Sequence, residues 1–504
     1  MALVSRLRVA GATLQPRSLA QWGLVVFLLA LSGWLGSRVG FFAWDYDEGV
    51  YLAEAWWVAR GEPLYTVVQT PLPPLLPWGV GGLFALLGAP SVTVARLLVV
   101  LCGVGGLAAT AGIAHALAPR HRDVAALVAA AAVGLAPLWL TYSRLVLADV
   151  PALSLALGAV WSALRVWRDG RRRWLVLSGG LAAAAVLTKL SAVFLVPLLA
   201  TVVLLRPGGT WRTWWRDGLA LGGGAAGLAL PVLLAVDLPA AYQAAVRYHL
   251  NVRSAWEGPP YSWRVLLDFV VAYAAWWLTA GIGLTALARR RRWREMTLLT
   301  AWLGTTLFLV LDHRPLWLHL LLPLLPPLGI AAGVGAGKWL AAERAPLARR
   351  RTIWAGAVGL ALVWGASWFS AARLTRAALA PPSHVWHWET VLGAWLRETV
   401  PPDQFVITDD PMLVLRAGRL VPPSFTDTSY TRIRSGQLTD EDLIAEASRT
   451  RAAAVISWRD RFPLLPRWMA WVEAHYVLRC DYGPHRRVYV RPDLAQRVRQ
   501  CPGP

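Results

Sequence analysis

The sequence predicts an all-α polytopic membrane protein of about 11 transmembrane helices, followed by a small C-terminal α/β domain. Of its 504 residues 56% are hydrophobic and only 16% are charged, whereas soluble domains average about 25% charged residues. Long uncharged runs, such as residues 175–187 and 219–236, recur along the chain. The composition changes near residue 380, and nearly half of the 29 acidic residues follow that point.

The basic charge is a topology signal. A net charge of +21 would suggest nucleic-acid binding in a soluble protein. Here the arginines form short clusters between apolar runs, which is how cytoplasmic loops of membrane proteins are marked. We therefore expect membrane lipids, and no nucleic acid, as the partners of these side chains.

The arginine clusters orient the chain in the cell membrane. Arg6, Arg8 and Arg17 precede the first apolar run, which predicts a cytoplasmic N-terminus. That run is long enough to remain as a helix and is not expected to be cleaved. Later clusters alternate with outer loops, which places residues 380–504 outside. The predicted helices share an apolar composition and cover residues 22–42, 93–117, 124–142, 147–167, 174–188, 190–205, 218–236, 265–288, 296–311, 318–337 and 352–372.

Two domains follow from this pattern. Residues 1–375 form the transmembrane domain, with a long first outer loop over residues 43–92 that is rich in acids and prolines. Within the loop, residues 75–89 are apolar but short and glycine-rich, so we expect a re-entrant or interfacial segment. Residues 380–504 form the extracytoplasmic α/β domain.

The C-terminal domain alternates between predicted helices and strands. Thr439 is expected to cap a helix, with Asp442 in the reciprocal position of a capping box. Strand–helix–strand order suggests a parallel pair of strands. The expected elements are a helix over 384–399, a strand over 404–408, the capped helix, a strand over 453–457, a Trp-rich helix over 463–474 and a terminal hairpin over 476–480 and 487–490.

The cysteine and glycine patterns give little information about function. The three cysteines have no metal-ligand spacing, and Cys480 and Cys501 could pair if their region is extracytoplasmic. Gly222–Gly224 is expected to allow close helix packing and not to bind a nucleotide.

Unusual polar residues converge on the outer face. Asp47 and Glu48 follow the first helix, Asp149 begins the fourth, and Lys189 ends the fifth. Lys189 is one of only two lysines in a chain that otherwise uses arginine, and an ionisable group at membrane depth is a functional candidate. Arg314 and His319 lie between the ninth and tenth helices, on the same face.

This set of residues suits group transfer. A carboxylate can take the proton of an attacking hydroxyl or amine. Cationic side chains can hold an anionic phosphate leaving group. Lysine binds phosphate as a point charge. A lipid-linked phosphate donor would bring its headgroup to this depth.

The segment W-D-Y-D-E-G-V-Y-L-A-E-A-W-W-V-A-R-G-E-P-L-Y, followed by P-L-P-P-L, resembles the first outer loop of the GT-C glycosyltransferases. It is most similar to the branch that includes protein O-mannosyltransferases and the aminoarabinose transferases of lipid A (glycosyltransferase families 39 and 83). The resemblance extends over about the first 370 residues and implies a GT-C type fold, a polyprenyl-phosphate sugar donor and an inverting transfer to a protein, lipid or glycan acceptor. It implies that Asp47 is the catalytic base and that Glu48 supports it. Three shorter motifs also resemble those of the family: A-D-V-P at Asp149, L-T-K at Lys189 and the His-then-Pro run at His319. The resemblance implies that these residues bind the donor and its phosphate. We add Arg314 to this group.

Two features depart from the family pattern. Leu72 stands where the family often has a basic residue, and its neighbours Gln69, Thr70 and Pro71 include no acid. We therefore do not assign the aminoarabinose reaction. No metal ligands and no cofactor are assigned, and a requirement for a divalent metal ion is left open.

Other interpretations remain at this stage. The Asp47–Glu48 pair also fits a helix N-terminus, Asp149 before Pro151 is an ordinary helix start, and Lys189 could extend from a helix end to the interface. The alternative functions are a secondary transporter and a non-catalytic assembly protein. Against transport, the ionisable groups gather at one face and no internal repeat is evident.

Overall fold

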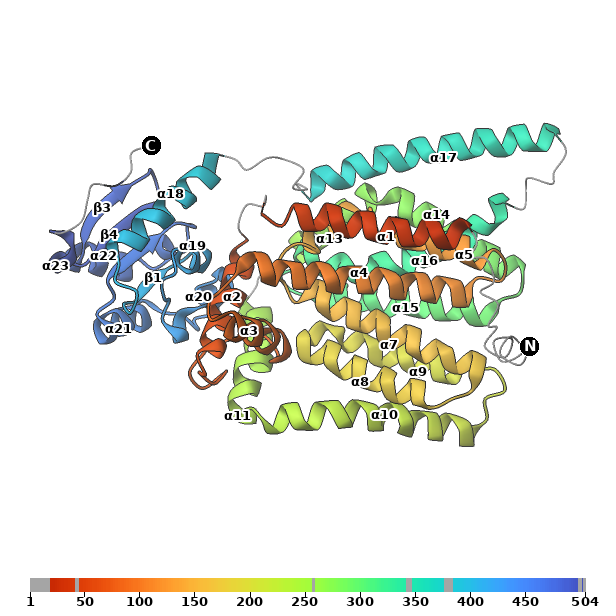
Figure 1. The fold of residues 1–504 in the computed structure, drawn as a ribbon, viewed down its shortest axis with the longest axis horizontal. Helices are drawn as coiled ribbons and strands as arrows, with labels where there is room; N and C mark the ends of the chain where they lie inside the picture. The colour runs from red at the N-terminus through yellow and green to blue at the C-terminus, as the bar shows by residue number, and fades with distance from the viewer. Residues whose placement is uncertain are drawn as a thin grey trace, which may run out of the picture.

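The computed structural model describes residues 19–40, 45–255, 259–340, 347–375, 384–496 and 501. The predicted Arg6, Arg8 and Arg17 cluster lies outside these residues. The chain forms a long helical bundle and a small mixed domain that sits at one end of it (Figure 1). Helix α17 lies along one edge of the bundle and α10 along the opposite edge.

The bundle contains the predicted helices. Among the described residues six helices are long and apolar enough to cross a membrane, and one bent pair would make a seventh. The chain is therefore a multi-pass membrane protein. The bundle elements are α1 (Leu19–Ser37), α4 (Val92–Leu117), α5 (Arg122–Gly134), α6 (Pro137–Tyr142), α7 (Asp149–Asp169), α8 (Arg173–Thr188), η2 (Leu190–Phe194), α9 (Leu195–Leu204), α10 (Trp211–Leu234), α13 (Pro259–Ala272), α14 (Ala274–Arg289), α15 (Trp293–Asp312), η4 (Leu318–Leu324), α16 (Leu325–Leu340) and α17 (Leu347–Leu374).

Two predicted helices are broken. The segment 124–142 divides into α5 and α6, and Pro137 begins the second piece, as expected of a residue that cannot continue a helix. The segment 265–288 bends by 71° between α13 and α14. The apolar run 75–89 forms the short helix α3 (Leu75–Leu87).

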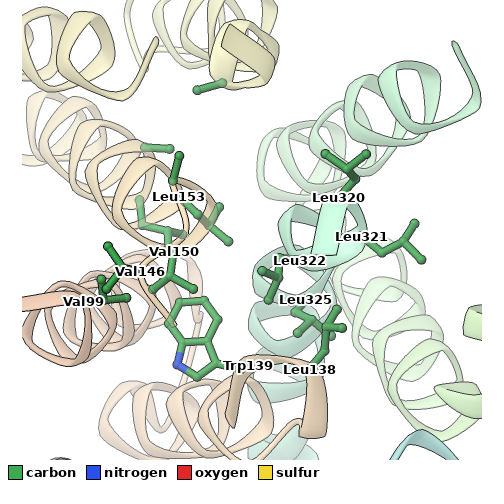
Figure 2. Close-up of a cluster of buried hydrophobic side chains, with 14 of the residues drawn as sticks. Val99, Leu138, Trp139, Val146, Val150, Leu153, Leu320, Leu321, Leu322 and Leu325 are labelled. Carbon is green, nitrogen blue, oxygen red and sulfur yellow. The ribbon is translucent and has the colours of Figure 1, made fainter. Parts of the chain in front are cut away.

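The bundle core positions the start of α7. Side chains of Val99, Trp139, Val150 and Leu322 point into one buried cluster, contributed by α4, α6, α7 and η4 (Figure 2). Val150 is fully buried and directly follows Asp149. Close packing of this kind permits little movement, so the core fixes where Asp149 stands.

Helices α8 and α10 approach each other at two glycines. A Cβ atom added to Gly179 would overlap the carbonyl oxygen of Leu221, and one added to Gly224 would overlap that of Val176. Such contacts are typical of membrane helices packed through small residues. Gly224 thus confirms the expected packing role of its cluster, whereas Gly222 and Gly223 face open space.

The end of the bundle nearest the C-terminal domain carries the first loop. This loop forms α2 (Tyr46–Ala59) and α3, which lie between the bundle and the C-terminal domain (Figure 1). A second connection contributes α11 (Leu238–Ala241), the π-helix η3 (Tyr242–Arg247) and α12 (Tyr248–Ala255).

The C-terminal domain is built on a four-stranded sheet of order β1-β2-β4-β3. Strands β1 (Val406–Thr408) and β2 (Ala454–Ser457) are parallel, with Ile407 opposite Val455, as the sequence predicted. Strand β4 (Arg487–Val490) pairs antiparallel with β2 and with β3 (Val477–Asp481). The remaining elements are α18 (His384–Thr399), α19 (Pro411–Arg416), η6 (Pro423–Phe425), α20 (Tyr430–Arg434), α21 (Asp440–Thr450), η7 (Phe462–Leu464), α22 (Pro466–His475) and α23 (Pro492–Ala495).

Two local features of this domain were visible in the sequence. Thr439 caps α21, and the reciprocal bonds with Asp442 complete the predicted capping box. Cys480 and Cys501 form a disulfide, with their Cα atoms 5.5 Å apart. A disulfide suits an oxidising, extracytoplasmic environment.

The C-terminal domain packs tightly on α2. A Cβ atom added to Gly49 would lie 2.6 Å from the backbone nitrogen of Met412 in α19. The Trp57 indole donates to the carbonyl of Val421 at 2.9 Å. The Thr426 hydroxyl donates to the carbonyl of Gln69 at 3.0 Å. The interface is therefore made of direct backbone and side-chain contacts.

We expect Gly224→Ala to destabilise the bundle, because the added methyl group must separate α8 from α10. Overpacking of this kind costs about 1–3 kcal/mol. The matched control is Gly223→Ala, whose methyl group meets open space. Thermal unfolding in detergent checks the difference, and equal melting temperatures for the two variants would mean that the helices do not approach so closely.

Candidate active site

The first turn of α2 presents two neighbouring acids to different surroundings. Asp45 caps the helix, and its carboxylate accepts a hydrogen bond from the Asp47 amide at 3.0 Å. Asp47 and Glu48 follow in the first turn, where the helix dipole favours negative charge. Asp47 is mostly buried but keeps some exposed surface, whereas Glu48 is fully buried.

Glu48 forms a buried ion pair with Arg96. The Arg96 Nε and Nη2 atoms donate to the two carboxylate oxygens at 2.7 and 2.5 Å. The amide of Val146 donates to the same carboxylate at 2.9 Å, and Arg96 also donates to the carbonyl of Val39 at 2.5 Å. Glu48 thus ties α2 to α4 and to the segment that leads to Asp149. The sequence predicted that Glu48 supports Asp47, and that role stays a prediction; the structure shows that Glu48 is buried and paired with Arg96.

Asp149 and Lys189 form a second ion pair. The Lys189 ammonium lies 2.6 Å from Asp149 Oδ1, and the two side chains are 16% and 7% exposed. Asp149 is the first residue of α7. Lys189 occupies an extended residue between α8 and η2. Because the chain is extended at Lys189, between α8 and η2, the lysine side chain can reach Asp149 at the start of α7.

His313, at the end of α15, and His319, in η4, complete this group. The ring of His319 packs edge-on against Tyr142, with centroids 5.7 Å apart, and lies within electrostatic reach of Asp149 and Lys189. Burial, with the positive charge of Lys189 second, lowers the pKa of His313 to about 4. His313 is therefore neutral near pH 7. We call Asp47, Asp149, Lys189, His313 and His319 the polar site.

Asp47 and the Lys189–Asp149 pair share one electrostatic environment. Burial, followed by the negative charges of Asp45 and Asp427, raises the pKa of Asp47 to about 7, and the positive charges of Arg461 and Lys189 oppose this rise. Burial, and then the charges of Asp47 and Asp149, raise the pKa of Tyr51. The two halves of the polar site therefore act on each other and on the same tyrosine.

Arg314 follows His313 but belongs to different surroundings. It lines a small hollow with Ser262, Val310 and Leu316, between α13 and α15. The polar site thus contains four of the six site residues predicted from the sequence, together with His313. The structure places the other two elsewhere, Glu48 in the core and Arg314 beside this hollow.

Residues of the C-terminal domain border the polar site, which sequence reasoning missed. The Tyr46 hydroxyl donates to Asp427 Oδ1 at 3.0 Å and accepts from the amide of Thr428 at 2.7 Å. The guanidinium of Arg461 lies 3.5 Å from the centroid of the Tyr46 ring. The available signal was the hydroxyl-rich run around Asp427, S-F-T-D-T-S-Y-T.

Glu54 is a further buried acid that sequence reasoning did not single out. Its Oε2 accepts from the Thr70 hydroxyl at 2.9 Å, and its Oε1 has no partner in the structure. Burial raises its pKa well above the usual value. Thr70 also accepts from the amide of Leu72 at 3.1 Å, so this acid braces the proline-rich end of the loop.

The acids and histidines of the polar site do not by themselves form a metal centre. Within the part of the chain that the structure describes, no group of three or more His, Cys, Asp and Glu side chains is arranged to hold a metal ion. The polar site offers the carboxyl group of Asp47, whose pKa is raised by burial to about 7, within electrostatic reach of the Lys189 ammonium group. Such a carboxyl can accept a proton, and the ammonium can bind an anion.

A protein-family model supports the expected relationship. Residues 71–235 match the model described as dolichyl-phosphate-mannose-protein mannosyltransferase. The matched segment contains Asp149 and Lys189 but begins after Asp47. No curated protein matches the sequence.

Solved structures share the whole fold. ArnT from Cupriavidus metallidurans bound to undecaprenyl phosphate matches with a TM-score of 0.65 and 16% identity, over 97% of this chain and 100% of that chain. The oligosaccharyltransferase of Archaeoglobus fulgidus in its apo form matches with a TM-score of 0.57 and 13% identity, over 93% of this chain and 74% of that one. The arabinofuranosyltransferase AftD from Mycobacteria matches with a TM-score of 0.54 and 16% identity, over 92% and 40%. The chain therefore has the GT-C fold that its first loop predicted, with a polar site at the junction between its bundle and its C-terminal domain.

Proposed function

We propose that this protein is an integral membrane glycosyltransferase that moves a sugar from a polyprenyl-phosphate donor to an acceptor at the extracytoplasmic face. The observation that carries the proposal is the Lys189–Asp149 ion pair, with 2.6 Å between Nζ and Oδ1, which has Asp47 within electrostatic reach of its lysine. Burial raises the pKa of Asp47 to about 7. A general base is most effective when its pKa lies near the working pH.

The proposed reaction is a single inverting displacement. An acceptor hydroxyl or amine attacks the anomeric carbon of the sugar while Asp47 takes its proton. The bond between the sugar and the phosphate oxygen breaks, and the electron pair leaves with the polyprenyl phosphate. Lys189 holds this phosphate, and Asp149 orients Lys189. Glu48 positions the base by tying α2 to α4.

Proteins of the same fold support the choice of donor. ArnT was solved with undecaprenyl phosphate, and the archaeal oligosaccharyltransferase AglB with a dolichol-phosphate and an inhibitory peptide. The matched family model also names a dolichyl-phosphate sugar. The Cys480–Cys501 disulfide favours an extracytoplasmic C-terminal domain. An odd number of spans, such as the 11 expected from the sequence, would then place the N-terminus in the cytoplasm. Comparison of surface glycans and glycolipids with and without the protein, by mass spectrometry, would identify sugar and acceptor.

Asp47→Asn is expected to lower the rate of transfer by roughly 10²–10⁴-fold, the usual contribution of a general base. Asparagine has nearly the same size and shape as aspartate, so the melting temperature of this variant should stay near that of the wild type. Glu48→Gln is the matched comparison. It leaves the buried Arg96 charge without its counter-ion, which costs about 3–5 kcal/mol, so its main effect should be on the melting temperature. A wild-type rate of transfer in Asp47→Asn would exclude Asp47 as the general base.

The pH dependence follows from the same group. Only deprotonated Asp47 can accept the proton, so kcat/KM should rise with pH and reach half its plateau near pH 7, because the raised pKa is about 7. An unperturbed aspartate would reach half-plateau near its ordinary value of 3.8. Initial rates between pH 5 and 9 with a synthetic donor check this expectation, and a flat profile across that range would contradict it.

Lys189 is expected to act mainly on donor affinity. Lys189→Gln alone would leave Asp149 without its cation, so the test uses the double variant Lys189→Gln/Asp149→Asn, which keeps a neutral hydrogen-bonded pair. A hydrogen bond to a charged group contributes about 1.5–3 kcal/mol, so the KM for the donor should rise roughly ten- to hundredfold. Asp149→Asn with Lys189 retained is the companion variant. Unchanged donor affinity in the double variant would exclude phosphate binding by Lys189.

A further inference from the structure

Two parts of the C-terminal domain converge on the residue that precedes Asp47. The segment after η6 provides Asp427 and Thr428, which bind the Tyr46 hydroxyl as acceptor and donor at 3.0 and 2.7 Å. The loop after β2 provides Arg461, whose guanidinium lies over the rings of Tyr46 and Tyr430, 3.5 and 5.0 Å from their centroids. Both the ring and the hydroxyl of Tyr46 are thus in contact with the C-terminal domain.

These two parts are themselves fixed within the domain. The Asp427 carboxylate also accepts from the amide of Ser429 at 2.9 Å. The amide of Arg461 donates to the buried carboxylate of Asp409 at 3.1 Å, and its Nη1 donates to the Asp409 carbonyl at 3.3 Å. Asp409 follows β1 directly, so the ends of the parallel strands set the position of Arg461.

The domain as a whole is also held against the first loop. Contacts at Gly49, Trp57 and Gln69 lie on α2 and on the loop beyond it. A further contact joins Tyr248 of α12 to Thr431, with 2.7 Å between the hydroxyl oxygens. The position of Asp427 and Arg461 relative to Asp47 is therefore set by several independent contacts.

We propose that Asp427 and Arg461 are positioning residues of the transfer site: they hold Tyr46 and surround the base with one negative and one positive charge. This inference rests on the proposed function, since it assigns a task only if Asp47 is the base. It makes the C-terminal domain a part of the site and not an appended unit.

The charges around Asp47 support opposite effects for the two residues. The negative charge of Asp427 raises the pKa of Asp47, and the positive charge of Arg461 lowers it. Asp45 acts in the same direction as Asp427, and Lys189 acts in the same direction as Arg461. Among the described residues, Tyr51, Tyr142 and Glu54 also interact electrostatically with this carboxyl.

The test measures the pH profile of kcat/KM in the full-length protein with a synthetic polyprenyl-phosphate sugar. Asp427→Asn keeps an acceptor oxygen for Tyr46 but removes the negative charge, so the midpoint should move to lower pH. Arg461→Gln should move the midpoint to higher pH. A neighbouring charge typically shifts a pKa by roughly one unit or more, so shifts of about 0.5–1.5 pH units are expected. In the double variant the two shifts should largely cancel.

Matched controls come from the same domain. Glu441 and Arg467 form an ion pair, and their side chains are 58% and 74% exposed. Glu441→Gln and Arg467→Gln remove the same charges without touching α2, and should leave the wild-type midpoint. Tyr46→Phe removes the hydrogen bonds to Asp427 and Thr428 without changing a charge, so it should lower kcat with a smaller change in midpoint. Asp427→Ser replaces the asparagine variant if that variant does not fold, and Arg461→Met replaces the glutamine variant on the same condition.

The outcomes separate the two proposals. Opposite midpoint shifts from Asp427→Asn and Arg461→Gln support the inference, since loss of folding alone would not move a midpoint in two directions. Midpoints equal to those of the Glu441 and Arg467 controls overturn it, while loss of transfer in Asp47→Asn keeps the proposed function. Wild-type transfer by Asp47→Asn overturns the proposed function itself.

Discussion

The arrangement of this molecule depends on a buried ion pair between Glu48 and Arg96. Both side chains are fully buried, and removal of charge from water is costly unless the charges are paired and hydrogen-bonded. The pair meets this condition, because the carboxylate also accepts from Val146 and the guanidinium also donates to Val39. Four separate parts of the chain therefore meet at one point. The start of α2 and the segment that leads to Asp149 cannot move independently.

Adjacent residues of one helix turn thereby take different tasks. Glu48 points into the core and its charge is fully compensated. Asp47 faces the junction with the C-terminal domain, where burial and neighbouring acids raise its pKa to about 7. The spacing of an α-helix turns adjacent side chains by about 100°, which is enough to separate these surroundings.

The sequence was informative where structure depends on local pattern. Apolar runs predicted the bundle helices, and the Thr439–Asp442 spacing predicted a helix start. The breaks between α5 and α6 and between α13 and α14 were missed, because an uncharged run looks the same whether it is straight or bent. Asp149 and Lys189 were recognised as unusual polar residues at membrane depth, but their direct contact required the fold.

The remaining parts of the site depend on contacts between distant segments. Arg96 stands alone in an apolar run, which signals a buried acidic partner but does not say which one. Asp427 and Arg461 reach Tyr46 only because the C-terminal domain docks on α2, and docking depends on the shapes of two surfaces that no local pattern records. One residue among the first fifty nevertheless reflects this docking. No side chain fits at Gly49, since the backbone of Met412 occupies that space. The glycine of the D-E-G sequence therefore reflects the docking of a domain that is synthesised much later. A related chain with a larger residue at this position must dock its C-terminal domain differently or lack that domain.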